Sequence, residues 1–207
     1  MHSCALCTLG KTHSGKVKGV TLSLKKSGAI PVEVAGILPE LVFGKEPVEI
    51  ASFKVLVGNE SVDLGDVFEV KYEGDEALIF EGELKHVKGI GVEMTSGLIM
   101  VNGDAGMHLG QRMKGGTIVV NGNLEPRWGG MIMVFGSVGN RVGEGMRRGL
   151  IAVTGDAGDF AGVNMIAGTI VVFGKMGLNS GGGMKRGSIV SIGGTDRVLS
   201  TFGYSCL

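Results

Sequence analysis

Apolar and polar residues alternate in six short segments of the second half of the chain, and each segment is bounded by glycine. The segments are GLIMVNG (97–103), GTIVVNG (116–122), GMIMVFG (130–136), GLIAVTG (149–155), GTIVVFG (168–174) and GSIVSIG (187–193). Alternation with a period of two is typical of a β-strand that buries one face. The pattern therefore predicts six strands whose inward faces carry a ladder of isoleucines: Ile99, Ile118, Ile132, Ile151, Ile170 and Ile189.

A second element, Gly-x-x-Met-x-x-Gly, recurs between these segments, and the segments start at intervals of 19, 14, 19, 19 and 19 residues. Within a repeat the glycines are spaced 6, 7 and 6 residues apart, a spacing that is costly inside a helix, at roughly 1 kcal/mol for each glycine. At a corner, glycine tolerates positive φ without a Cβ clash. The predicted corners are Gly97, Gly103, Gly110, Gly116, Gly149, Gly155, Gly162, Gly168, Gly174, Gly181 and Gly187.

Three short sides in each repeat predict an all-β fold, a single-stranded right-handed parallel β-helix of about six 19-residue coils. Its strands would stack at about 4.8 Å per coil. The methionines of the second element, Met94, Met113, Met146, Met165 and Met184, form a column. Unbranched thioethers fill narrow cores well, so we interpret this column as core rather than as metal ligands. Replacing Gly168 by valine should therefore destabilise a corner.

The repeat breaks once, where the step is 14 residues and the segment 123–129 replaces the expected second side. This segment contains Arg127 and Trp128, two residue types that are favoured at interface hot spots. It is either a loop that shortens one corner or a loop that contacts a partner.

The same register predicts the outer surface. The outward middle positions of the six strands are apolar, and their set includes Met100, Val119, Met133 and Val171. Contiguous apolar surface suggests burial, either against the amino-terminal region or against another subunit. Basic residues, Lys114, Arg147 and Lys185, follow three of the core methionines, joined by Arg112, Arg148 and Arg186. They form either a solvated edge that prevents aggregation or a contact for an acidic partner.

Composition separates two regions. Of the 39 glycines among 207 residues, 29 lie in the 113 residues from 82 to 194. We therefore divide the chain into a small β-rich amino-terminal region that caps the first coil (1–81), the repeat region (82–194) and a tail (195–207). Collagen, disorder and a membrane span are excluded by the missing Gly-X-Y period, the 43% apolar content and the lack of a long apolar run. Balanced charge, with 20 basic and 20 acidic residues, gives no reason to expect nucleic-acid binding.

Alternating runs and turn residues predict strands in the amino-terminal region at 20–25, 32–34, 53–57, 62–64, 67–72 and 78–81. Pro39 and Pro47 bracket a segment that fits one short helical turn.

Candidate chemistry is sparse. Cys4-x-x-Cys7 is the only spacing typical of metal or redox sites, and it has no second pair at a zinc-site distance, which favours an incidental or structural origin. The Gly-x-Gly matches fall at corners rather than at a strand-to-helix phosphate turn. We therefore expect no catalytic residue, cofactor or metal on this chain. Three cysteines without a secretory segment favour the cytoplasm.

The 19-residue Gly-x-x-Met-x-x-Gly-x-Ile-x-Val-x-Gly repeat resembles the GXGXG family. Its members include the carboxy-terminal domain of the glutamate synthase large subunit, the C subunit of formylmethanofuran dehydrogenase, and a relative in the methylotrophic formyltransferase/hydrolase complex. The segments LVFGKEPVEI (41–50), VGNE (57–60) and LGDVFEV (64–70) are similar to the region before the coils in the C subunit of formylmethanofuran dehydrogenase.

This resemblance implies a non-catalytic scaffold subunit of the complex that reduces CO2 and forms N-formylmethanofuran, or runs the reverse, in archaeal methanogenesis or methane oxidation. It also implies that the molybdenum or tungsten pterin, the iron–sulfur clusters and a dinuclear metal site lie on other subunits. The implied partners are amidohydrolase-like, molybdopterin and ferredoxin-like subunits. The alternatives are a structural subunit of a formyltransferase/hydrolase complex or of a glutamate-synthase-type enzyme, and a stand-alone binding module.

Overall fold

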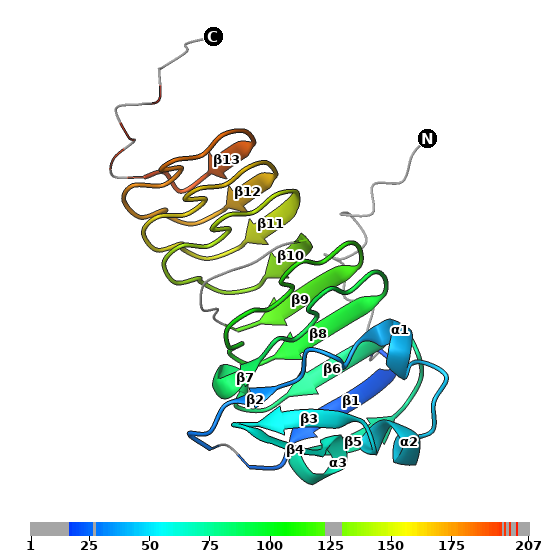
Figure 1. The fold of residues 1–207 in the computed structure, drawn as a ribbon. Coiled ribbons are helices and arrows are strands. Elements are labelled where there is room, and N and C mark those ends of the chain that lie inside the picture. The colour runs from blue at the N-terminus through cyan, green and yellow to red at the C-terminus, as the bar shows by residue number, and fades with distance from the viewer. Residues whose placement is uncertain are drawn as a thin grey trace, which may run out of the picture.

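The computed structural model describes residues 17–26, 28–122 and 130–195, together with Arg197, Leu199 and Phe202. Its strands form a nine-stranded sheet of order β13-β12-β11-β10-β9-β8-β6-β1-β5 and a four-stranded sheet of order β4-β3-β2-β7. The six repeat strands are β8 (Leu98–Asn102), β9 (Thr117–Asn121), β10 (Gly130–Val134), β11 (Gly149–Val153), β12 (Thr169–Val172) and β13 (Ser188–Ser191). Figure 1 shows them side by side as successive steps of one ladder.

The repeat strands pair in parallel and in register. Ile99 lies opposite Ile118, Ile118 opposite Ile132, and the ladder continues through Ile151 and Ile170 to Ile189. The first five of these isoleucines are buried, and Ile189 is partly buried at the last strand. The predicted alternation is thus present. The isoleucines form a column because strands that pair in parallel and in register place the same position of each repeat side by side.

The 14-residue step does not disturb this register. Ile118 of β9 pairs with Ile132 of β10, although the connection between them is five residues shorter than the others. Arg127 and Trp128 lie in this connection, outside the described residues, so their predicted contact role stays a prediction.

The amino-terminal half extends the large sheet and adds the small one. Strand β6 (Ala77–Glu81) pairs in parallel with β8 and with β1 (Gly19–Leu24), and β5 (Phe68–Tyr72) is antiparallel to β1. The second sheet contains β2 (Val32–Glu33), β3 (Lys54–Val57), β4 (Glu60–Asp63) and β7 (Val87–Lys88). Strands therefore form near each predicted position. The large sheet continues from β6 into β8. This pairing does not test the predicted domain boundary at residue 81, which stays a prediction.

Short helices connect these strands: α1 (Pro39–Val42), α2 (Pro47–Ala51), α3 (Leu64–Val67) and the 3-10 helix η2 (Leu84–His86). Pro39 and Pro47 occupy the starts of α1 and α2, where a missing N–H costs nothing. The prolines that bracketed one predicted turn thus begin two helices.

Phe68 and Phe80 pack edge to face in the core, with ring centroids 6.1 Å apart.

The predicted fold class, an all-β right-handed parallel β-helix with a small cap, is wrong. The described residues form a mixed α/β structure with parallel and antiparallel pairing in two sheets. The prediction assumed three extended sides in each repeat, but only the alternating segment is an extended strand. The next segment contributes isolated bridges through Val138, Ala157 and Met176. The methionine segment is built of turns, because residues such as Arg112 (φ 57°) and Asn164 (φ 55°) adopt positive φ, which a strand excludes.

The predicted corner glycines lie at or near the ends of these segments, and Gly149 is the first residue of β11. Nine have positive φ: Gly97, Gly103, Gly110, Gly116, Gly149, Gly162, Gly168, Gly181 and Gly187. Gly155 and Gly174 differ, since they lie against a polar side chain and backbone of the preceding repeat that leave no room for a Cβ atom. Four methionines of the column are buried (Met94, Met113, Met146 and Met165), and Met184 packs partly buried against the core.

Candidate interaction surface on the outer sheet face

One row of apolar side chains crosses the face of the large sheet opposite the isoleucine ladder. Cross-strand register joins Ile79 to Met100, and then Val119, Met133, Ala152, Val171 and Val190 in order. Val119 is buried, Met100, Met133 and Val171 are half-buried, and Val190 is exposed. The structure therefore places the four predicted outward residues on one face and in one row.

Two further rows widen this face over β10–β13. Met131, Leu150, Thr169 and Ser188 lie on one side of the middle row. On the other side, Phe135, Thr154, Phe173 and Ile192 continue the ladder, each donating its N–H to a strand carbonyl of the preceding repeat. We define the outer face as these eight residues together with Met133, Ala152, Val171 and Val190. None of the twelve is charged, nine are apolar, and five are exposed large hydrophobics.

The same side of the sheet is polar at its other end. A shallow pocket of about 380 Å³ is lined there by Thr21 and Ser23 of β1, Lys71 of β5 and Glu81 of β6. Asn102 donates a hydrogen bond to Glu81 (3.1 Å), and Asn121 donates to Asn102 (2.8 Å). The apolar character is thus confined to the repeat strands. Sequence reasoning found the middle row but did not assign Phe135, Phe173 and Ile192 to this face, although each follows a middle-row residue by two positions within the same alternating segment.

Two pairs of basic residues lie where the chain enters β11 and β13, and Ile166 and Ala167 occupy the corresponding positions before β12. Arg147 and Arg148 precede β11, and Lys185 and Arg186 precede β13. All four are exposed, and no ion pair involves them among the described residues. We call these four residues the basic border. Lys114 occupies the corresponding place before β9 and is also exposed.

Arg112 does not belong to this border. It makes an ion pair with Glu93 in the preceding repeat, with an N–O distance of 3.0 Å.

At the opposite edge, where the strands end, side-chain oxygens of one repeat accept hydrogen bonds from backbone N–H groups of the next repeat. Asp156 accepts a hydrogen bond from the N–H of Lys175 (2.8 Å), and Asp159 accepts one from Leu178 (2.7 Å), each one repeat ahead. Ser137 and Asn140 accept in the same way from the N–H groups of Asp156 (3.1 Å) and Asp159 (2.8 Å). These side chains satisfy backbone donors at turns.

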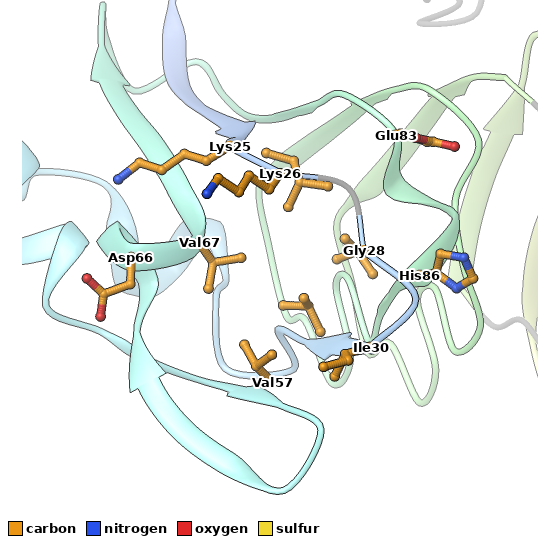
Figure 2. A pocket seen from close by; sticks show the side chains of 12 residues that line it. Lys25, Lys26, Gly28, Ile30, Val57, Asp66, Val67, Glu83 and His86 are labelled. Carbon is orange, nitrogen blue, oxygen red and sulfur yellow. The ribbon is translucent and has the colours of Figure 1, made fainter.

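A pocket of about 500 Å³ lies between the two sheets (Figure 2). Leu24, Val32, Val57, Val67 and Val87 contribute apolar surface to it. Its charged residues, Lys25, Lys26, Asp66 and Glu83, are all exposed and of both signs, and His86 is exposed as well. Figure 2 shows Asp66 and Glu83 on opposite sides, so these groups do not converge on one point. Lys25 donates to the carbonyl of Gly65. Sequence reasoning gave no signal for this pocket.

Other chemistry is limited in the part of the chain that the structure describes. It contains no group of three or more His, Cys, Asp or Glu side chains arranged to hold a metal ion. Cys4 and Cys7 fall outside the described residues. No described helix is long and apolar enough to cross a membrane.

Comparison with known proteins gives consistent matches. The C subunit of tungsten-containing formylmethanofuran dehydrogenase 2 from Methanothermobacter marburgensis is 38% identical over 96 residues, which are 44% of this chain and 36% of the relative. The C subunit of molybdenum-containing formylmethanofuran dehydrogenase 1 from Methanothermobacter thermautotrophicus is 38% identical over 94 residues, 44% of this chain and 24% of that one. The matched part thus spans about a third or less of these relatives. No model of a protein family matches the chain.

A solved structure covers more of the chain. It is a chain of the formyltransferase/hydrolase complex (FhcABCD) from Methylorubrum extorquens, in complex with methylofuran. It is 31% identical, covers 87% of this chain and 79% of its own length, and superimposes with a TM-score of 0.72.

Proposed function

Because this chain belongs to the family of the formylmethanofuran dehydrogenase C subunit, we propose that it is a non-catalytic scaffold subunit of a complex that forms N-formylmethanofuran from CO2 or runs the reverse reaction. The observation that supports this proposal most strongly is the agreement between two kinds of relative. The sequence relatives are named as the C subunit of that enzyme, and the structural match spans 79% of a chain from a related complex.

The tertiary structure supports a scaffold role. The repeat strands present an uncharged apolar outer face, and contiguous apolar surface marks association sites on soluble proteins. In this proposal the tungsten or molybdenum pterin, the iron–sulfur clusters and the dinuclear metal site lie on the amidohydrolase-like, molybdopterin and ferredoxin-like subunits. The names of the relatives, which include tungsten- and molybdenum-containing enzymes, support a metal-pterin in the complex. We place the complex in the cytoplasm.

A subunit of a formyltransferase/hydrolase complex is the second candidate, because the solved relative comes from such a complex. The two candidates differ in chemistry. Formylmethanofuran dehydrogenase transfers electrons, whereas formyl transfer and hydrolysis need none.

Purification of the tagged chain from its native source, without denaturant, tests the proposal. We expect the eluate to contain tungsten or molybdenum and to oxidise N-formylmethanofuran with a dye as electron acceptor. An eluate that transfers or hydrolyses the formyl group but contains neither metal would support the second candidate. A chain that elutes alone would contradict both.

A further inference from the structure

Resting on the proposed scaffold function, we infer that the outer face of β10–β13 binds a partner subunit. The contacting surface of that partner is an apolar patch with carboxylates around it. The face supplies apolar contact area, and the basic border supplies the charge that selects and orients the partner.

The size of the face fits the centre of a protein interface. Three inter-strand spacings of about 4.8 Å and four residue rises of about 3.3 Å give a patch of roughly 14 by 13 Å before side chains are added. Side chains enlarge it to roughly 300 Å², the size at which exposed patches are often functional. A standard interface needs about 800 Å² from each partner, so contacts must extend beyond the face. The basic border is the adjacent surface.

The composition also fits an interface centre. Met131, Phe135 and Phe173 are methionine and aromatic residues, which are enriched at interfaces, and charged residues are depleted at interface centres. An isolated sheet face in water would carry charged or polar side chains at such positions, as the β1–β5 end of the same sheet does with Lys71 and Glu81.

The border favours one kind of occupant. The repeat between the two basic pairs carries Ile166 and Ala167 at these positions, so the pairs lie about two strand spacings, roughly 9.6 Å, apart. Each pair is a local centre of positive charge that a carboxylate of a partner would neutralise. In a face-to-face contact between two copies, neither the outer face nor the basic border supplies a carboxylate, because all their charged residues are basic. A partner with carboxylates around an apolar patch satisfies both halves of the surface, because complementary charge gives specificity to an apolar contact.

Methionine oxidation provides a matched probe. Met131 lies on the outer face with 43% of its surface exposed, and Met107 lies elsewhere with 41% exposed. In the isolated chain hydrogen peroxide should oxidise both at similar rates. In the purified native complex we expect Met131 to be protected severalfold and Met107 to be oxidised as before, measured by peptide mass spectrometry. Equal oxidation of both in the complex would overturn the inference.

Substitutions test the charge requirement. Val190 on the outer face and Leu178 off it are 44% and 43% exposed, so a charged residue at either position should be tolerated by the fold. We expect Val190→Glu to weaken retention of the partner subunits about tenfold or more, and Val190→Lys to weaken it less, because Glu also meets the partner's carboxylates. Leu178→Lys should leave retention unchanged. Equal effects of Glu and Lys at Val190 would contradict the inferred carboxylates on the partner subunit.

The border is tested by Arg147→Glu combined with Lys185→Glu. Both side chains are exposed, so the variant should fold like the parent and lose partner subunits at lower salt concentrations. Unchanged assembly at every salt concentration would contradict a role for the border. These experiments distinguish failure of the inference from failure of the proposed function. If the unmodified chain purifies alone, the proposed function is wrong. If it copurifies with partner subunits and every face variant does so equally, only the inference is wrong.

Discussion

Gly168 offers a quantitative test of how the repeats stack. Its φ of 124° is a conformation that residues with a Cβ atom rarely adopt. A Cβ atom placed there would lie 2.5 Å from Met146 Cε and 3.2 Å from the carbonyl oxygen of Gly149, both in the preceding repeat. We expect Gly168→Ala to lower the free energy of unfolding for two reasons, backbone strain and a shift of a buried methionine.

The magnitude follows from these two effects. An unfavourable φ costs about 1–3 kcal/mol, and forcing extra volume into a packed site costs about 1–3 kcal/mol, of which the flexible Met146 side chain relieves part. A total of about 3 kcal/mol corresponds to a melting temperature roughly 6–12 °C lower for a chain of this size. Gly168→Val should cost more, because its two methyl groups crowd the same corner.

Urea denaturation followed by far-UV circular dichroism measures this change. Gly36→Ala is the control, since no heavy atom lies within 4 Å of its Cβ position and its φ is not in the positive range. We expect that control to stay within about 0.5 kcal/mol of the parent. In a Met146→Leu background, which lacks the ε-carbon, Gly168→Ala should cost less than in the parent. Denaturation of Gly168→Ala at the parent's urea concentration would refute the assigned corner.

Three further predictions concern polar groups. Asp159→Ala should lower stability by about 1 kcal/mol because it leaves a backbone N–H of the next repeat without its acceptor, whereas Asp159→Asn keeps the acceptor; urea denaturation compares them. Asn102→Asp should also destabilise, since it places a carboxylate beside that of Glu81, and the loss should shrink at high salt. The hydrogen bond to Asp75, and then its negative charge, raise the pKa of Tyr72 above 10.0, so Asp75→Asn should lower that pKa in an absorbance titration. Because the folded pKa is the higher one, this contribution to stability is present below about pH 10 and is lost as the pH rises through the folded pKa. A titration that is unchanged in the Asp75→Asn variant would rule out the assigned cause.

The alternating segments were predictable because a strand's side chains alternate with a period of two whatever surrounds it. Ile99, Ile118, Ile132, Ile151 and Ile170 therefore occupy the predicted buried column. The outward column was predictable on the same ground, and the structure places Met100, Val119, Met133 and Val171 together in one row.

The prediction of the fold class was wrong because the local sequence pattern of one segment fits two backbone conformations. The Gly-x-x-Met-x-x-Gly spacing fits either a short strand or a series of turns, and the choice depends on φ at non-glycine residues such as Arg112 and Asn164. Hydrogen bonds to the preceding and following repeats stabilise that backbone, including those from Lys114 N–H to the Met94 carbonyl and from Asn164 N–H to the Gly182 carbonyl. Such contacts join residues about one repeat apart and leave no local signature.

Sequence by itself determined the repeat, its register and which side chains face the core, because these follow from periodicity and from the backbone freedom of glycine. Tertiary structure decided the rest. Only strand pairing shows that β6 and β1 extend the repeat sheet, that Asp156 and Asp159 join successive repeats, and that the outer face widens to Phe173 and Ile192 beside the basic border. Pairing partners and surface neighbours depend on how distant segments meet in space, and a linear pattern does not encode that meeting locally.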